Sequence, residues 1–444
     1  MLDLSHREFS ISRRSLLIGT ALAPLTFAVS CSADRAADAV PERALTHVRL
    51  IDGTGAAVVH DATVVLSGDR IVAAGTNIAV SDTAEVIDGQ GMTVLPGLID
   101  AHVHLGGRTA NSGPAFGGKD LTDNYAAVRQ RSLQYGVTTV RSLGDFLDDS
   151  LALREDTAQG RVLGPRIVAS GPSFQIKGGH PNGTVWANDT TTLANAARMP
   201  GTPAEASQMV DELAAKGVDV IKVIRSSMVM PTGGSTEKLP WNTVEAITTA
   251  AHRNNLKVAV HVEDPEDTLR AVEIGADDIE HMYVARTQPL ADESVYDDAF
   301  RLMAANGTVV TPTMVVNVHS DTPLDQLDLR TLTAGNKLIR RAFDHGVTLA
   351  VGSDAHVPDL QGRSLHAEIV MMVNDQGIPA LSALEAATST NATLLGLSDR
   401  LGTVEAGKLA DLLVVSGNPA ENIVDLQNVR MVIQGGKIVV DNTK

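Results

Sequence analysis

The chain has 444 residues, of which 43% are hydrophobic, and its formal net charge at pH 7 is −17. This length and hydrophobic content exclude a disordered or fibrous chain and suit one large barrel with a smaller domain. The excess of acidic residues would repel phosphate backbones and anionic membrane surfaces, so we expect no nucleic-acid partner.

An export signal is predicted at the N-terminus. Arg13 and Arg14 precede an apolar stretch that ends at Val29, a pattern typical of a twin-arginine secretory signal. The only cysteine, Cys31, follows this stretch and resembles the lipobox cysteine at which bacterial lipoproteins are cleaved and acylated. We therefore assign residues 1–31 to a signal and expect a periplasmic protein or a lipoprotein anchored at Cys31. The alternative is a secreted protein with no lipid at this cysteine.

A small β domain is predicted from the two ends of the mature chain. Short alternating strands run from Leu45 to Val94, and strands of the same kind recur from Ala410 to Val440. We expect residues 41–95 and 402–444 to meet in one β-sandwich domain.

The intervening residues 96–401 alternate between apolar, β-rich segments and stretches with helical spacing. This alternation predicts βα units and a parallel sheet, and eight units predict an α/β fold of the (β/α)8 TIM-barrel type. One such helix is expected from Ala204 to Lys216, with Gly217 as its stop signal. The eight candidate strands are Leu98 to His102, Val137 to Ser142, Arg166 to Ser170, Asp219 to Ile224, Lys257 to Val262, Asp278 to Met282, Thr308 to Thr313 and Thr348 to Asp354.

A metal site is predicted at the carboxyl ends of these strands, where TIM barrels place their active sites. His102 and His104 are two residues apart on a strand, so both side chains point the same way and can chelate one ion. Imidazole and carboxylate ligands suit zinc first, with manganese or cobalt as alternatives. Four further ligand-type residues follow at or near later strand ends, namely Lys222, His261, His281 and Asp354. This set indicates a metal-activated hydrolase, whereas unrelated core histidines are the simpler alternative.

The order H-x-H, Lys, His, His, Asp, flanked by terminal β segments, resembles the amidohydrolase superfamily over the whole mature chain. The motifs PGLIDAHVH, GPRIVASGP, GGHP and VGSD are similar to its imidazolonepropionase-like and Xaa-Pro dipeptidase-like branch. The resemblance implies two divalent metal ions, with His261 and His281 as ligands of the second. It also implies that carbon dioxide carboxylates Lys222, which then bridges both ions.

Two of these residues also stand out by their own chemistry. Lys222 lies in an apolar strand, where an uncompensated ammonium would be costly, although an ordinary pairing with a buried carboxylate is the alternative. Asp354 ends the eighth strand, where a carboxylate can bind a metal, accept a proton from water and pass it to a leaving nitrogen. Its alternative role is that of a helix N-cap.

Candidate substrate contacts follow other strand ends. His180, in the GGHP loop, is predicted to hydrogen-bond the carbonyl oxygen, a role that the resemblance favours; a solvated loop histidine is the alternative. Tyr283 and Arg225 are predicted to reach a substrate carboxylate. His356 is either a neighbour of the site or an exposed residue.

Together these features predict a metal-dependent hydrolase of amide C–N bonds, acting on small peptides or N-acyl amino acids through a metal-bridging hydroxide. The alternatives are a mononuclear deaminase or cyclic amide hydrolase, an esterase, lactonase or organophosphate hydrolase, and a non-catalytic binding lipoprotein. A homo-oligomer is expected, although no sequence feature specifies its size.

Overall fold

The computed structural model describes residues 42–105, 121–186, 188–229, 233–282, 290–317, 336–356 and 358–443. The predicted signal at 1–31, with Cys31, and the predicted substrate residue Tyr283 lie outside these described residues. Among the helices that are described, none combines the length and the apolar character needed to cross a bilayer.

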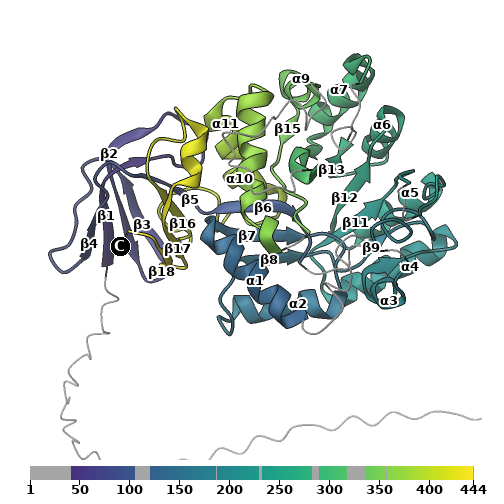
Figure 1. Ribbon diagram of the computed structural model, residues 1–444, viewed down its shortest axis with the longest axis horizontal. Helices are drawn as coiled ribbons and strands as arrows, with labels where there is room; N and C mark the ends of the chain where they lie inside the picture. The colour runs from purple at the N-terminus through teal and green to yellow at the C-terminus, as the bar shows by residue number, and fades with distance from the viewer. Residues whose placement is uncertain are drawn as a thin grey trace, which may run out of the picture. The chain divides into compact units, whose positions relative to one another are not determined.

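Both ends of the described chain contribute strands to one eight-stranded sheet, in the order β18-β17-β16-β5-β1-β2-β3 with β4 beside β1. Strand β5 joins the two halves, because it pairs in parallel with β1 and antiparallel with β16. Figure 1 shows the N-terminal strands (purple) beside the C-terminal ones (yellow). The sheet encloses an apolar core that includes Val64, Leu412 and Ile433. The strands are β1 Glu42–Leu50, β2 Val59–Ser67, β3 Arg70–Gly75, β4 Glu85–Asp88, β5 Thr93–Pro96, β16 Leu412–Val415, β17 Val429–Gln434 and β18 Lys437–Asp441.

Of the parallel strands that the structure describes after β5, eight form the barrel. They pair as β6-β7-β8 and, together with the short strands β9 (Ser173–Phe174) and β10 (Ala197–Arg198), as a second ladder that ends at β15. Backbone hydrogen bonds close both seams: Asp219 N donates to Ala169 O, and Ala101 N donates to Val351 O, each at 2.9 Å. The barrel strands are β6 Leu98–Val103, β7 Val137–Ser142, β8 Arg166–Ala169, β11 Val220–Ile224, β12 Lys257–Val262, β13 Asp278–His281, β14 Val309–Thr311 and β15 Thr348–Leu349.

Each of these strands lies within or overlaps one of the eight predicted segments, and the predicted fold class, a barrel with a small β domain built from both ends, is confirmed. Figure 1 shows α4 to α7 on the outer side of β11 to β13. The helices are α1 Leu121–Gln134, α2 Leu147–Ala158, α3 Thr190–Ala196, α4 Pro203–Lys216, α5 Trp241–Arg253, α6 Pro265–Glu273, α7 Asp297–Asn306, α9 Leu338–Asp344, α10 Arg363–Val370, α11 Ala380–Glu385 and α12 Asn391–Leu394.

Helix α4 shows how the sequence positions these elements. The side chain of Thr202 caps its start by accepting a hydrogen bond from the backbone of Glu205, and Pro203 occupies the first turn, where its missing N–H costs nothing. Val210 and Leu213 lie on its buried face. Gly217 ends the helix in the left-handed conformation, at φ +82°, as predicted.

The segment after β15 passes so close to β6 that residue 352 has no room for a side chain. A Cβ at Gly352 would lie 2.7 Å from the Cβ of His102 and 2.6 Å from Cγ2 of Thr311. We expect Gly352→Ala to lower the free energy of unfolding by about 1–3 kcal/mol, because overpacking forces neighbouring atoms apart. Denaturant-induced unfolding measures the change.

Gly201→Ala is the matched control, since a Cβ there would meet only the flexible end of Glu205, at 3.2 Å. Equal stabilities of the two variants would contradict the close approach of the two segments.

Candidate metal centre

The first barrel strand and the segment after the last strand bring three ligand-type side chains together. The ligating atoms of His102, His104 and Asp354 all lie within 4.8 Å of one another. Oδ1 of Asp354 is 2.9 Å from Nε2 of His104 and 3.4 Å from Nε2 of His102. Two imidazole nitrogens and a carboxylate oxygen that converge in this way form a donor set suited to zinc or a similar divalent ion.

The backbone that presents Asp354 is itself strained. Asp354 has φ +51°, a left-handed conformation that a residue with a side chain adopts only at a cost in energy. Its N–H donates to the carbonyl of His102 at 2.8 Å. The buried Asp100 holds the neighbouring residue by accepting from Ser353 Oγ at 2.6 Å and from Ser353 N at 3.0 Å. These contacts fix Asp354 against the histidine pair.

A line of imidazole rings extends the site across the barrel end. Ring centroids lie 4.8 Å apart for His102 and His281, 4.2 Å for His281 and His261, and 5.3 Å for His261 and His180. Burial lowers the pKa of His281 well below its usual value, and the adjacent His261 lowers it further. Burial likewise lowers the pKa of His102. Both rings are therefore neutral near pH 7 and can offer a lone pair to a metal.

His104 and Asp354 are in direct contact, with Nε2 and Oδ1 2.9 Å apart. Burial alone would raise the pKa of Asp354, but His102 and His104 outweigh it and hold this pKa well below its usual value. The pKa of His104 is raised, because its hydrogen bond and charge interaction with Asp354 outweigh burial. A metal ion fits between these donors, since it would replace a proton that the imidazole and the carboxylate already share.

Lys222 is the least expected side chain of the group. It lies in the middle of β11 and is 1% exposed, and its Nζ has no hydrogen-bond partner among the described residues. Burial lowers the pKa of its ammonium, although the charges of Glu280 and Asp354 oppose the shift. The alternative of a lysine hydrogen-bonded to a buried carboxylate is therefore not met in the described part of the chain. An unsatisfied buried nitrogen at a strand centre suggests that it serves a further group.

Glu280, Glu263 and Thr313, which the sequence motifs did not indicate, each contact one histidine of the site. Glu263 follows His261 by two residues, so the same-face rule applied to H-x-H could have pointed to it. No local spacing could have brought Glu280 to His102, because 178 residues separate them. The contacts are Glu280 Oε2 to His102 Nδ1 at 2.5 Å, Glu263 Oε1 to His261 Nε2 at 3.0 Å, and Thr313 Oγ1 to His281 Nδ1 at 2.6 Å.

His180 and Arg225, two of the predicted substrate contacts, have different partners in the structure. Nδ1 of His180 is 2.7 Å from Thr184 Oγ1, and its ring neighbours His261. The guanidinium of Arg225 pairs with Asp267 at 3.2 Å and lies over the ring of Trp241, 4.2 Å from its centroid.

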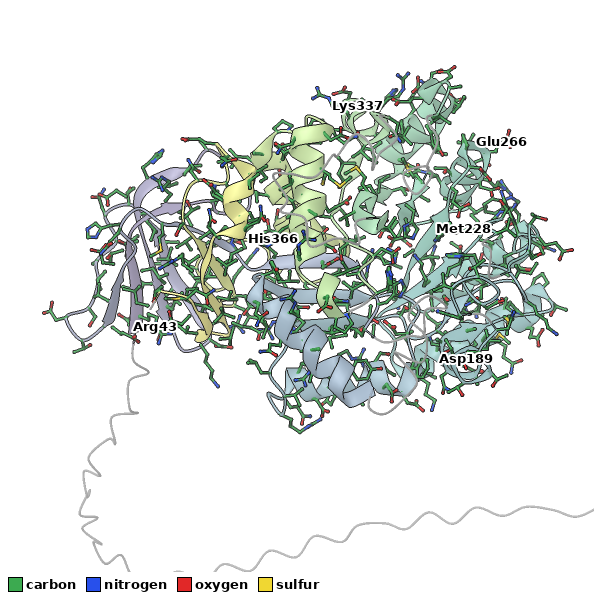
Figure 2. The ribbon with its side chains drawn as sticks, in the orientation of Figure 1. Arg43, Asp189, Met228, Glu266, Lys337 and His366 are labelled. Atoms are coloured by element: carbon green, nitrogen blue, oxygen red, sulfur yellow. The ribbon has the colours of Figure 1, made fainter. Side chains whose placement is uncertain are left out.

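Two other histidines lie at or beyond the edge of the site. Nδ1 of His356 is 3.1 Å from the backbone oxygen of Asp354, next to the site. His366, labelled in Figure 2, lies buried in α10, where its Nε2 is 2.7 Å from the carbonyl oxygen of Tyr135. This contact ties α10 to the end of α1 and gives His366 a structural role.

Comparisons with known proteins agree with this architecture. The model of the amidohydrolase family matches residues 93–439. An imidazolonepropionase of Symbiobacterium thermophilum is 23% identical over 420 residues, which cover 88% of this chain and 92% of that protein. An imidazolonepropionase of Streptomyces coelicolor is 27% identical over 385 residues, which cover 81% and 86% of the two chains.

Among solved structures, a Xaa-Pro dipeptidase with bound methionine in its active site is 30% identical, with a TM-score of 0.75 and coverage of 89% of this chain and 99% of that chain. Aspergillus niger ochratoxinase is 23% identical, with a TM-score of 0.74 and coverage of 90% and 96%, and shows likeness of fold alone.

A parallel barrel that gathers imidazoles, a carboxylate and a buried lysine at its strand ends defines a class of metal-dependent hydrolases. This chain belongs to the amidohydrolase family, and it is a metal-dependent hydrolase of C–N bonds. The predicted family and reaction class are confirmed, while the role of each site residue stays a prediction.

The unpartnered Nζ of Lys222 can be tested through stability. We expect Lys222→Met to raise the free energy of unfolding of the metal-free protein by about 1–3 kcal/mol, because it removes a buried polar atom that lacks a partner and keeps the apolar stem. Denaturant unfolding in the presence of a chelator, in buffer depleted of carbon dioxide, measures this change.

Lys257→Met is the matched control on the neighbouring strand. The Nζ of Lys257 donates to the carbonyls of Leu394 at 2.9 Å and Thr393 at 3.2 Å, so its loss should lower stability. An equal loss of unfolding free energy in both variants would show that the Nζ of Lys222 does have a hydrogen-bond partner.

Proposed function

We propose that this chain is a binuclear metal-dependent amidohydrolase that cleaves small peptides or N-acyl amino acids. The observation that carries the proposal is the buried, unpartnered Nζ of Lys222 beside the cluster of His102, His104 and Asp354. A single ion held by that cluster would leave the lysine without a role, whereas two ions would need a bridging anion.

Carboxylation would turn Lys222 into that anion. The ammonium would first lose a proton, and the neutral amine would then attack carbon dioxide. A nitrogen–carbon bond would form as one carbon–oxygen π bond opens, and a second proton would be released, leaving a carbamate anion with two oxygen donors. The lowered pKa of Lys222 supports this step, because only the neutral amine is nucleophilic.

The proposed ligand sets follow from the positions of the side chains. His102, His104 and Asp354 would hold one ion, His261 and His281 the other, and the carbamate of Lys222 would serve both. Zinc suits these donors best. Divalent ions at these positions would lower the pKa of a bound water and polarise the scissile carbonyl.

The chain's own residues would then move the protons. Asp354 would take a proton from the attacking water and deliver it to the leaving nitrogen, which cannot depart as an amide anion. His180 would donate a hydrogen bond to the carbonyl oxygen as negative charge develops there. Thr184 engages Nδ1 of His180, which leaves Nε2 for the substrate. Burial and the nearby His261 lower the pKa of His180 to about 3, so the ring acts in its neutral form.

The proposed substrate class follows from one relative and two side chains. One of the similar solved structures is a Xaa-Pro dipeptidase, which favours a dipeptide with a bulky leaving amine. Arg225 would bind the substrate carboxylate, but it would have to share its guanidinium with Asp267. Tyr283 is a second proposed contact.

Location is proposed from the sequence alone. The twin arginines and Cys31 support export and a periplasmic or lipid-anchored enzyme. Such an enzyme would meet peptides outside the cytoplasm.

A one-metal enzyme that hydrolyses a cyclic amide is the second candidate. Within the described residues, the only group whose ligating atoms converge within 4.8 Å is that of His102, His104 and Asp354, which is enough for one ion. The imidazolonepropionases among the relatives point the same way.

Elemental analysis of the purified mature protein separates the two candidates. We expect about two metal ions per chain, together with turnover of members of a library of dipeptides and N-acyl amino acids. One metal with turnover of a cyclic amide such as imidazolonepropionate would support the second candidate instead. Metal-free protein after metal-replete expression would exclude both.

The double role of Asp354 is tested by Asp354→Asn. The amide keeps an oxygen donor but cannot accept the proton, so we expect at least one metal to remain bound while kcat falls by roughly 10²–10⁴-fold. Metal content and steady-state kinetics on the same sample measure both effects. The control is Asp359→Asn, at an exposed position, and unchanged kcat in Asp354→Asn would exclude it as the base.

A further inference from the structure

We propose that Glu280 and Glu263 are positioning residues, one for each of the two metal positions, which orient His102 and His261 and strengthen them as donors. This inference rests on the binuclear function proposed above. Both act through a histidine ring and neither is proposed to touch the metal.

Glu280 selects which nitrogen of His102 faces the site. Its Oε2 is 2.5 Å from Nδ1, and the two side chains are 0% and 1% exposed. A ring whose Nδ1 donates its proton to a carboxylate presents Nε2 as the lone-pair nitrogen. That nitrogen lies 3.4 Å from Oδ1 of Asp354, on the side where the other ligands gather.

A buried network keeps Glu280 in place. Its second oxygen, Oε1, accepts from Arg141 at 2.8 Å, and Arg141 also pairs with Asp278 and donates through Nε to the carbonyl of Ala101 at 2.5 Å. Thr311 donates to Asp278 at 2.9 Å. The network therefore spans β6, β7, β13 and β14. Arg141 faces the two carboxylates of Asp278 and Glu280, so this group of three side chains carries a net negative charge. That charge would favour a cation at Nε2 of His102, on the opposite side of the ring from Glu280.

Glu263 acts on the other side of the site. It is 3% exposed, and its Oε1 lies 3.0 Å from Nε2 of His261 and accepts from Ser226 Oγ at 2.6 Å. Its backbone oxygen accepts from the hydroxyl of Tyr296 at 2.6 Å, which anchors the chain at the strand end. With Nε2 committed to Glu263, Nδ1 of His261 is the nitrogen that remains for a metal.

His281, another proposed ligand, has no carboxylate at its second nitrogen among the described residues. Nδ1 of His281 is held by Thr313, a neutral hydroxyl, at 2.6 Å. A carboxylate partner raises the basicity of an imidazole more than a hydroxyl does. His102 and His261, the two rings that contact a carboxylate, thus belong to different proposed ions. Each ion would have one strengthened histidine donor, which would help the chain to retain both ions.

The test is competition for Zn²⁺ between the full mature chain and a chromophoric chelator. We expect Glu280→Gln and Glu263→Gln each to weaken one of the two Zn²⁺ sites by about 10–100-fold, because glutamine keeps the shape and an acceptor oxygen but loses the charge. The double variant should weaken both sites. Wild-type affinity in the single variants would overturn the proposal.

Glu368→Gln is the matched control. Glu368 is an equally buried glutamate, and its contacts among the described residues are the backbone N–H groups of Met314 at 3.0 Å and Val315 at 2.8 Å. Its Zn²⁺ affinities should stay within about threefold of wild type, since a metal-directed loss is expected only where the carboxylate contacts a ligand. An equal loss in Glu368→Gln would show a general structural effect and overturn the proposal.

Unfolding of the metal-free variants separates positioning from folding. If Glu280→Gln does not fold because Arg141 loses one of its two carboxylate partners, Glu280→Asp keeps a negative charge there on a side chain too short to hold His102 and should show the same weakened site. One Zn²⁺ per wild-type chain would instead overturn the binuclear function and the role of Glu263. The loss of affinity in Glu280→Gln would still decide the role of Glu280.

Discussion

The hydrogen bonds between Asp100 and Ser353 are the contact on which the chemistry of this molecule depends. They join residues 253 positions apart and lock the segment after β15 against β6. Together with the hydrogen bonds from Ala101 N to Val351 O and from Asp354 N to His102 O, they hold Asp354 beside the histidine pair. Gly352 makes the approach feasible, because any side chain there would collide with His102. The contacts that close the barrel thus also place Asp354 beside the histidine pair.

The barrel interior beneath the site contains several buried charged side chains, which do not by themselves favour stability. Arg141, Asp278, Glu280 and Lys222 are all at most 2% exposed, and removing charges from water is costly even when they are paired. Backbone strain accumulates at the same end, with positive φ at His281, Thr313 and Asp354. Strain and buried charge at a site of this kind are usual where function outweighs stability.

The sequence was sufficient for the barrel, because segments rich in β-branched residues, such as Val137–Ser142, favour strands, and this one is buried along its whole length. It was less accurate at strand ends. The eighth segment was expected to extend to Asp354, but β15 is only Thr348–Leu349, since the chain must leave the extended conformation to aim Asp354 at the site. Glu280 escaped prediction for a different reason, because its partners come from β6 and β7 and only the closed barrel brings them together.

The geometry of Asp354 reconciles two roles that would otherwise conflict. The same oxygen, Oδ1, faces both His102 and His104, so ligation through it leaves Oδ2 to receive a proton. A carboxyl with a strongly lowered pKa is a weak base, but once protonated it is a strong acid, and the leaving amine has far higher proton affinity. A weak base removes a proton from water poorly. Bound metal ions would compensate, because they would lower the pKa of that water. In the proposed function, Asp354 would therefore serve the step in which the C–N bond breaks.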